Sequence, residues 1–174
     1  ILEEKLDEIF FTDLKTFIDE FKLPLKTSDV EKIWKYRGLK DVIKTVRDIN
    51  RYFNALRLRL PTIYMDVDII DFMLLEAVRV FDGKTYAIVL SYFQKNPYDR
   101  SKGKLLTEIR ETSSQKPIRS IIEYLELAET YRYQLSYTSD KRLIDPRYSD
   151  NYFSLALASK SIAEEEIKRF INVP

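Results

Sequence analysis

The chain has 174 residues, of which 45% are hydrophobic, and its 29 basic side chains are nearly balanced by 28 acidic ones. This length and composition suffice for one buried core, and a net charge of +1 provides no overall field that would attract nucleic acid. The sequence contains no histidine, no cysteine and only three isolated glycines. It therefore cannot form a Cys/His zinc site, a thiol or imidazole catalytic centre, or a glycine-rich phosphate loop.

Two further features concern the origin of the chain. No apolar run reaches the roughly 20 residues that span a bilayer, and no secretory leader is present, so we expect a cytoplasmic chain with no membrane partner. The sequence starts at Ile1 rather than at a methionine, and the amphipathic pattern of the first helix includes its first residues. This pattern predicts that the chain was cut from a longer polypeptide.

Apolar residues at intervals of three and four predict helices through the first half of the chain. The expected helices cover residues 1–22, 28–34, 41–60, 67–81 and 84–93. Ser28 and Glu31 have the spacing of a capping box, and Asp66 can cap the fourth helix. Pro61 is expected to end the third helix. The fourth helix is apolar on most faces, which predicts that it lies centrally in the core.

The second half is less regular. A helix is expected from near Pro117 to Ala128, and residues 134–150 have no sustained period and indicate a long connection. Ser161 and Glu164 have the spacing of a second capping box, which would open a final helix.

No stretch alternates strictly enough for a strand, and the sequence contains no repeat of fixed period. The predicted fold class is therefore all-α, an irregular bundle of about seven to nine helices. We expect a single helical domain, with residues 1–95 as one bundle and residues 96–174 as a C-terminal helical extension packed on it.

Three segments are informative about a family: residues 45–54 (TVRDINRYFN), 67–81 (VDIIDFMLLEAVRVF) and 152–157 (YFSLAL), the last followed by a short terminal helix. In order and spacing they resemble the region after the nucleotide-binding core in the KAP family of P-loop NTPases, which are bacterial and animal ATPases. The resemblance implies that residues 1–95 are a lid-like helical bundle.

The resemblance also implies a partner. This chain would be the C-terminal helical lid and regulatory region, and an upstream P-loop NTPase domain of the same polypeptide would bind ATP and Mg²⁺. The family's Walker loop and the acidic strand that helps to hold magnesium would both lie upstream, and neither is present here. We therefore expect no ATP hydrolysis by this chain alone, and the parent protein would be the enzyme.

Arg47, Asn50, Asn54 and Arg57 are spaced by three, four and three, which places them on one polar stripe of the helix over residues 41–60. The resemblance implies that Arg47 is a nucleotide sensor, with Asn54 and Arg57 beside it on the cofactor-binding face. A guanidinium suits this role because its charge is permanent and its donors form a planar fork. The alternative is a solvated helix face with paired charges.

Asp68, Asp71 and Glu76 are the carboxylates that a metal or acid–base site could use. We favour a different interpretation, in which Asp68 and Asp71 lie in the first turn of a helix and complement its dipole. Glu76 and Arg79 are three residues apart and indicate an ordinary ion pair.

Residues 131–152 contain five tyrosines among basic side chains, but three aspartates leave the segment nearly neutral. We therefore expect no nucleic-acid partner, since affinity for nucleic acid depends on uncancelled positive charge. A tyrosine-rich loop that packs onto the domain is the favoured interpretation, and a protein-interaction surface is the next.

The densest basic cluster lies beside two aromatic residues. Its members are Lys35, Arg37, Lys40 and Lys44, with Trp34 and Tyr36 adjacent. Solvated lysines at a helix junction are favoured over a binding surface. A freestanding helical adaptor, which would bind protein through the Trp34 surface or through the tyrosine-rich segment 131–152, is the alternative function.

Overall fold

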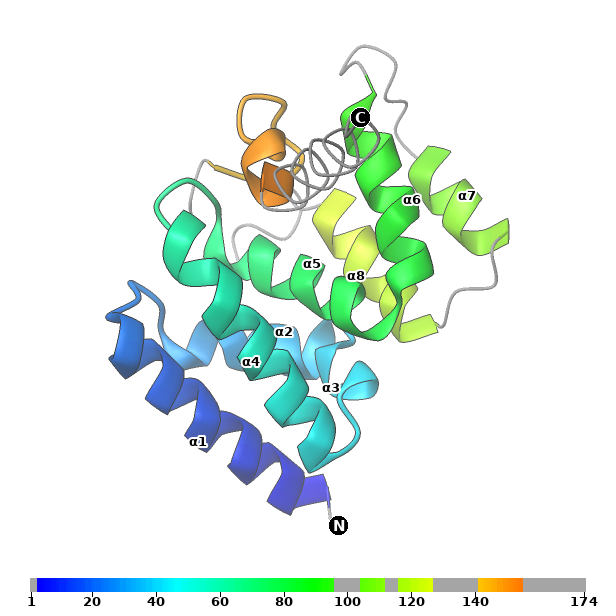
Figure 1. Cartoon of the computed structure of the whole chain (residues 1–174). Coiled ribbons are helices and arrows are strands. Elements are labelled where there is room, and N and C mark those ends of the chain that lie inside the picture. The colour runs from blue at the N-terminus through cyan, green and yellow to red at the C-terminus, as the bar shows by residue number, and fades with distance from the viewer. Residues whose placement is uncertain (1–2, 96–103, 112–115, 127–140, 155–174) are drawn as a thin grey trace, which may run out of the picture.

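The computed structural model describes residues 3–95, 104–111, 116–126 and 141–154, and every regular element in these ranges is a helix (Figure 1). The helices are α1 (Glu3–Phe21), α2 (Thr27–Tyr36), α3 (Leu39–Val42), α4 (Val46–Ile63), α5 (Ile69–Phe81), α6 (Gly83–Gln94), α7 (Lys104–Glu111), α8 (Lys116–Glu126) and a short helix over residues 149–154. The predicted all-α class is confirmed. Within these ranges, no helix has both the length and the apolar composition that crossing a bilayer requires.

Helix α5 forms the centre of the core. Only Arg79 and Phe81 of its residues are not buried, and the helix contacts α4, α6 and α8. The central position expected for this helix is confirmed, because a helix that is apolar on most faces is stable only when other elements surround it.

Helices α1 and α4 pack along each other and run in the same direction (Figure 1). Phe10 of α1 lies with its ring centroid 5.3 Å from that of Phe53, and Phe17 lies 5.9 Å from the same ring. One turn further along both helices, Glu20 pairs with Arg57. The first turns of α1 and α4 therefore lie at the same end of the molecule.

Helix α4 is separated from α3 by a short non-helical segment, where the sequence predicted one continuous helix over residues 41–60. α3 ends at Val42, and Thr45 begins α4 as an N-cap whose hydroxyl accepts a hydrogen bond from the Asp48 N–H at 3.1 Å. The Asp48 carboxylate in turn accepts from the Thr45 N–H at 3.0 Å, which completes a capping box. Two otherwise unsatisfied backbone donors are thereby paired, which favours a helix start at this point.

Three expectations about helix ends are corrected. α4 continues to Ile63 through Pro61, because proline removes a single hydrogen bond near the end of the helix. α2 starts after Lys26 without a side-chain cap bond, so the Ser28 capping box does not form. α5 is capped by Asp68 rather than by Asp66. The expected final helix, residues 161–170, lies outside the described residues.

Candidate functional site

The predicted sensor stripe lies on the outer face of α4. Arg47, Asn50 and Asn54 are exposed, and none of them forms a hydrogen bond or ion pair within the described part of the chain. Arg57 is half-buried, and its Nε donates to Glu20 Oε2 at 3.1 Å. Arg57 therefore attaches α4 to α1, whereas the guanidinium of Arg47 is available to an external ligand.

The opposite face of α4 is buried in the core, which holds the helix and its polar stripe in place. Ile49, Tyr52 and Phe53 are fully buried, and the Tyr52 hydroxyl donates to the Met73 carbonyl of α5 at 2.9 Å. Burial, together with the nearby Glu76 charge, raises the pKa of Tyr52 well above its usual value, so this hydroxyl stays protonated and keeps its hydrogen bond. The position of Arg47 is thus set by a helix that is held in the core.

The carboxylates at the start of α5 already have partners. Asp71 accepts two hydrogen bonds from Arg142, at 2.6 and 2.7 Å, and a third from the Leu143 N–H at 3.0 Å. Asp68 accepts from the Asp71 N–H at 3.0 Å as the N-cap of α5. Asp71 thus lies in the first turn as predicted, whereas Asp68 precedes that turn as the N-cap. No group of acidic residues in the described ranges has the arrangement of a metal site.

Burial raises the pKa of Asp68 to about 7, and the adjacent charge of Asp71 adds to the effect. A carboxylate removed from water is costly to ionise, and a second carboxylate nearby increases that cost. The hydrogen bond from Asp71 N–H and the charge of Arg142 oppose the rise without cancelling it. The ionisation of Asp68 is therefore expected to affect the stability of this region near neutral pH.

Glu76 is buried between two arginines. Its carboxylate pairs with Arg79 at 2.5 Å, as the spacing predicted, and also with Arg59 at 2.5 Å. Arg59 further donates to the Tyr152 carbonyl at 3.3 Å. This cluster holds α4, α5 and the helix over residues 149–154 together, so it has a structural role.

The tyrosine-rich segment packs onto the domain where it is described. The Tyr152 hydroxyl accepts from the Asp68 N–H at 2.8 Å and donates to the Lys141 carbonyl at 2.7 Å. Tyr148 is partly exposed, with the Arg147 guanidinium 5.2 Å above its ring. Packing is thus confirmed for Tyr152, whereas residues 131–140, with three of the five tyrosines, lie outside the described residues.

Trp34 is a core residue, and the predicted Trp34 surface is wrong. The side chain is 0% exposed, stacks on Phe10 at 3.9 Å and donates from Nε1 to Asp7 at 2.9 Å. Lys40 binds the other oxygen of Asp7 at 2.9 Å, and the Arg37 guanidinium lies 5.2 Å above the Tyr124 ring. Half of the basic cluster is thereby used for internal contacts.

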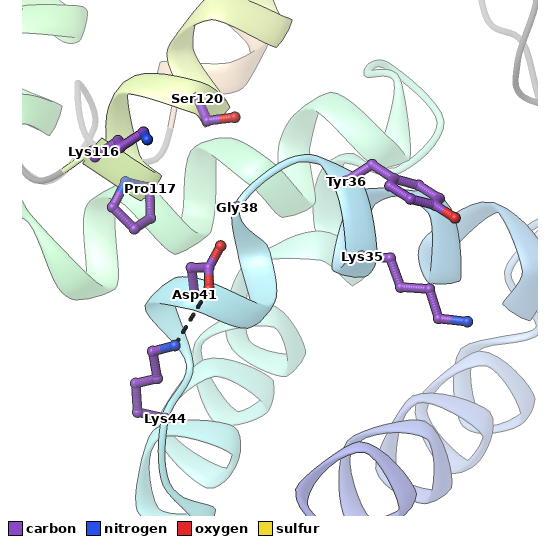
Figure 2. A pocket seen from close by; sticks show the side chains of 8 residues that line it. All are labelled: Lys35, Tyr36, Gly38, Asp41, Lys44, Lys116, Pro117 and Ser120. Carbon is purple, nitrogen blue, oxygen red and sulfur yellow. Dashed lines mark hydrogen bonds and ion pairs between the residues drawn. The ribbon is translucent and has the colours of Figure 1, made fainter. Parts of the chain in front are cut away.

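The rest of that cluster lines a groove of about 440 Å³ between the α2–α3 turn and the start of α8 (Figure 2). Its polar lining comprises Lys35, Tyr36, Asp41 and Lys44 from the first half of the chain, and Lys116 and Ser120 from α8. A second hollow of about 340 Å³ shares Lys116 and Ser120 and adds Arg119 and Glu123. The sequence did not indicate this groove, because no local pattern connects α8 to the α2–α3 turn.

Comparisons with family models, with curated proteins and with solved structures found no match. The resemblance to the KAP family thus stays a prediction from the three sequence segments named above.

Proposed function

We propose that this chain is the helical lid and regulatory region of a KAP-like P-loop ATPase, in which Arg47 reaches the nucleotide phosphates when the lid closes. The proposal rests on Arg47. Its guanidinium is exposed in the first turn of α4 and has no partner among the described residues. A cation at a helix N-terminus is opposed by the helix dipole, so a bound anion would relieve an unfavourable arrangement.

The arrangement of α1 and α4 supports this proposal. Because the two helices run in the same direction, any polypeptide that precedes α1 would join it at the end where Arg47 lies (Figure 1). A preceding nucleotide-binding domain would thus be next to the proposed sensor. Asn50 and Asn54 extend the same exposed stripe and would contact that domain beside the phosphates.

The proposed division of work places ATP and Mg²⁺ in the upstream domain and assigns no hydrolysis to this chain. Nucleotide binding would draw the first turn of α4 toward the phosphates, and the core contacts of α4 with α1 and α5 would transmit that movement to the other helices. The result would be a changed surface for a protein partner.

The test is made on the native polypeptide that carries these residues. Its sequence before Ile1 should contain a Walker loop after a strand, and Arg47→Ala should lower its steady-state ATPase rate by roughly tenfold or more. Lys84→Ala, which removes an exposed cation at the start of α6, is the matched control and should leave the rate unchanged. An unchanged ATPase rate in Arg47→Ala, or an upstream sequence without a Walker loop, would refute the proposal.

A helical adaptor is the second candidate, and two exposed apolar side chains favour it. Leu58 is 76% exposed on α4 and Met65 is 64% exposed in the turn that follows this helix. Exposed apolar side chains of this size can contact another protein. A native polypeptide without nucleotide-binding motifs, and with partner binding lost in Leu58→Glu, would support the adaptor over the lid.

A further inference from the structure

We propose that the groove between the α2–α3 turn and the start of α8 docks an acidic peptide segment of a partner protein. This inference is independent of the lid function, because the groove involves neither Arg47 nor its stripe. It accounts for the part of the basic cluster that the internal contacts do not use.

A close backbone contact builds the groove. Gly38 has φ +81°, and a Cβ at this position would lie 2.6 Å from the Pro117 carbonyl oxygen. Only glycine allows both this conformation and this approach. The α2–α3 turn therefore lies directly against the first turn of α8, and cations from two distant parts of the sequence meet at one surface.

The cations in the groove and in the adjoining hollow are available to a ligand. Lys116 lines both and Arg119 lines the hollow, and neither forms a hydrogen bond or ion pair within the described ranges. Lys44 pairs with Asp41 at 3.4 Å, and both side chains are mostly exposed. Lys35 pairs with Glu31 at 2.6 Å, also at the surface, and that hydrogen bond raises the pKa of Lys35. Exposed pairs of this kind are weak and can exchange for a ligand carboxylate.

The spread of the cations favours an extended ligand over a small anion. Figure 2 shows Lys35 and Tyr36 at one end of the groove, and Lys44, Lys116 and Ser120 at the other. The labelled cationic side chains lie apart in this view, whereas binding of one phosphate group is favoured by donors that converge on it. A peptide with acidic side chains several residues apart can reach both ends.

The carboxylates at this surface favour a peptide over nucleic acid. Asp41 lines the groove and Glu123 lines the adjoining hollow, so the evenly spaced phosphates of a nucleic acid would meet carboxylates as well as cations. A peptide can place its backbone N–H groups near these carboxylates and its acidic side chains near the cations. Tyr36, which is 70% exposed at the rim, adds an aromatic contact surface.

The test uses the whole chain and a fluorescein-labelled dodecapeptide of alternating Glu and Ser, with binding followed by fluorescence anisotropy at low salt. We expect the double variant Lys116→Glu/Arg119→Glu to weaken binding by about tenfold or more. The matched control is Lys5→Glu/Lys84→Glu, which makes the same change in net charge at exposed positions on α1 and α6 and should bind like the wild type. Tyr36→Ala, at an exposed position, should weaken binding without any effect on folding.

Three results would overturn the proposal. The first is no measurable binding by the wild-type chain, and the second is an equal loss in both double variants, which would show that only overall charge matters. The third is displacement of the peptide by single-stranded DNA of equal charge that itself binds more tightly, which would identify the groove as a nucleic-acid site. Circular dichroism of each variant establishes that the helices are retained.

Discussion

Arg142 and Asp71, 71 positions apart in the sequence, form an ion pair with two hydrogen bonds, of 2.6 and 2.7 Å, in the protein interior. The Asp71 side chain is completely buried and that of Arg142 nearly so. Two parallel hydrogen bonds between a guanidinium and a carboxylate set the relative orientation of both groups. The pair thereby fixes residues 141–154 against the first turn of α5.

Arg142→Ala should therefore destabilise the fold strongly, because Asp71 would remain buried with an uncompensated charge. Breaking a buried pair by removal of one partner costs about 3–5 kcal/mol, measured here as the change in free energy of unfolding in urea. Arg147→Ala is the matched control on the same segment, since Arg147 is exposed and its pair with Asp145 is at the surface. It should change the free energy by less than about 1 kcal/mol. Similar losses in the two variants would refute this account.

The raised pKa of Asp68 predicts that the stability of the fold depends on pH. Its pKa is raised to about 7 in the folded protein from 3.8, so the folded state binds a proton that the unfolded state has released between these two values. The free energy of unfolding should accordingly fall as the pH rises from about 4 through about 7. A difference of about three between the two pKa values corresponds to roughly 4 kcal/mol.

Asp68→Asn isolates this effect, because an asparagine can accept the same hydrogen bond from the Asp71 N–H without a charge. The variant should be more stable than the wild type at pH 8, with little difference at pH 4, in urea unfolding series at both values. Asp66→Asn, at an exposed carboxylate two residues earlier, is the control and should show no such dependence. A D68N variant less stable than the wild type at pH 8 would contradict the raised pKa.

The periodic parts of the fold could be predicted from the sequence because their signal is local. The apolar stripes of α1, α4 and α5 indicated helices, and the same spacing placed Arg47 on an exposed face. α7 was missed, because its eight residues are too few for a sustained period. Trp34 was assigned to a possible binding surface because lysines flank it in the sequence. Its spacing of four from Val30 instead places both residues on the buried face of α2.

Contacts between distant segments could not be predicted in this way. Arg142 lies in a stretch without a period, so nothing local identified it as the partner of Asp71. The groove could not be predicted for the same reason, since it depends on the approach of Gly38 to Pro117, which are far apart in the sequence. Periodicity reports which side of an element is buried, and it carries no information about which element covers that side.

Capping boxes illustrate a related ambiguity, which a pair of variants can resolve. Ser28 and Thr45 are each followed three residues later by an acidic residue, but only Thr45 caps a helix. Thr45→Ala should lower the free energy of unfolding by about 1 kcal/mol, as loss of an N-cap does. Ser28→Ala should have almost no effect, because Ser28 lies inside α2 without a cap bond. Urea unfolding measures both, and an equal cost for the two variants would show that the capping assignment is wrong.

Gly38 and Gly83 provide the last prediction, since the same substitution should have opposite effects at the two positions. At Gly38 a methyl group would meet the Pro117 carbonyl oxygen at 2.6 Å in a backbone conformation, φ +81°, that side chains rarely adopt. Gly38→Ala should therefore destabilise the protein by about 1–3 kcal/mol. At Gly83, in the first turn of α6, nothing lies within 4 Å of an added Cβ, so Gly83→Ala should stabilise it by about 0.5–1 kcal/mol. Thermal and urea unfolding compare the two directly, and a neutral Gly38→Ala would show that the α2–α3 turn does not press against α8 as described.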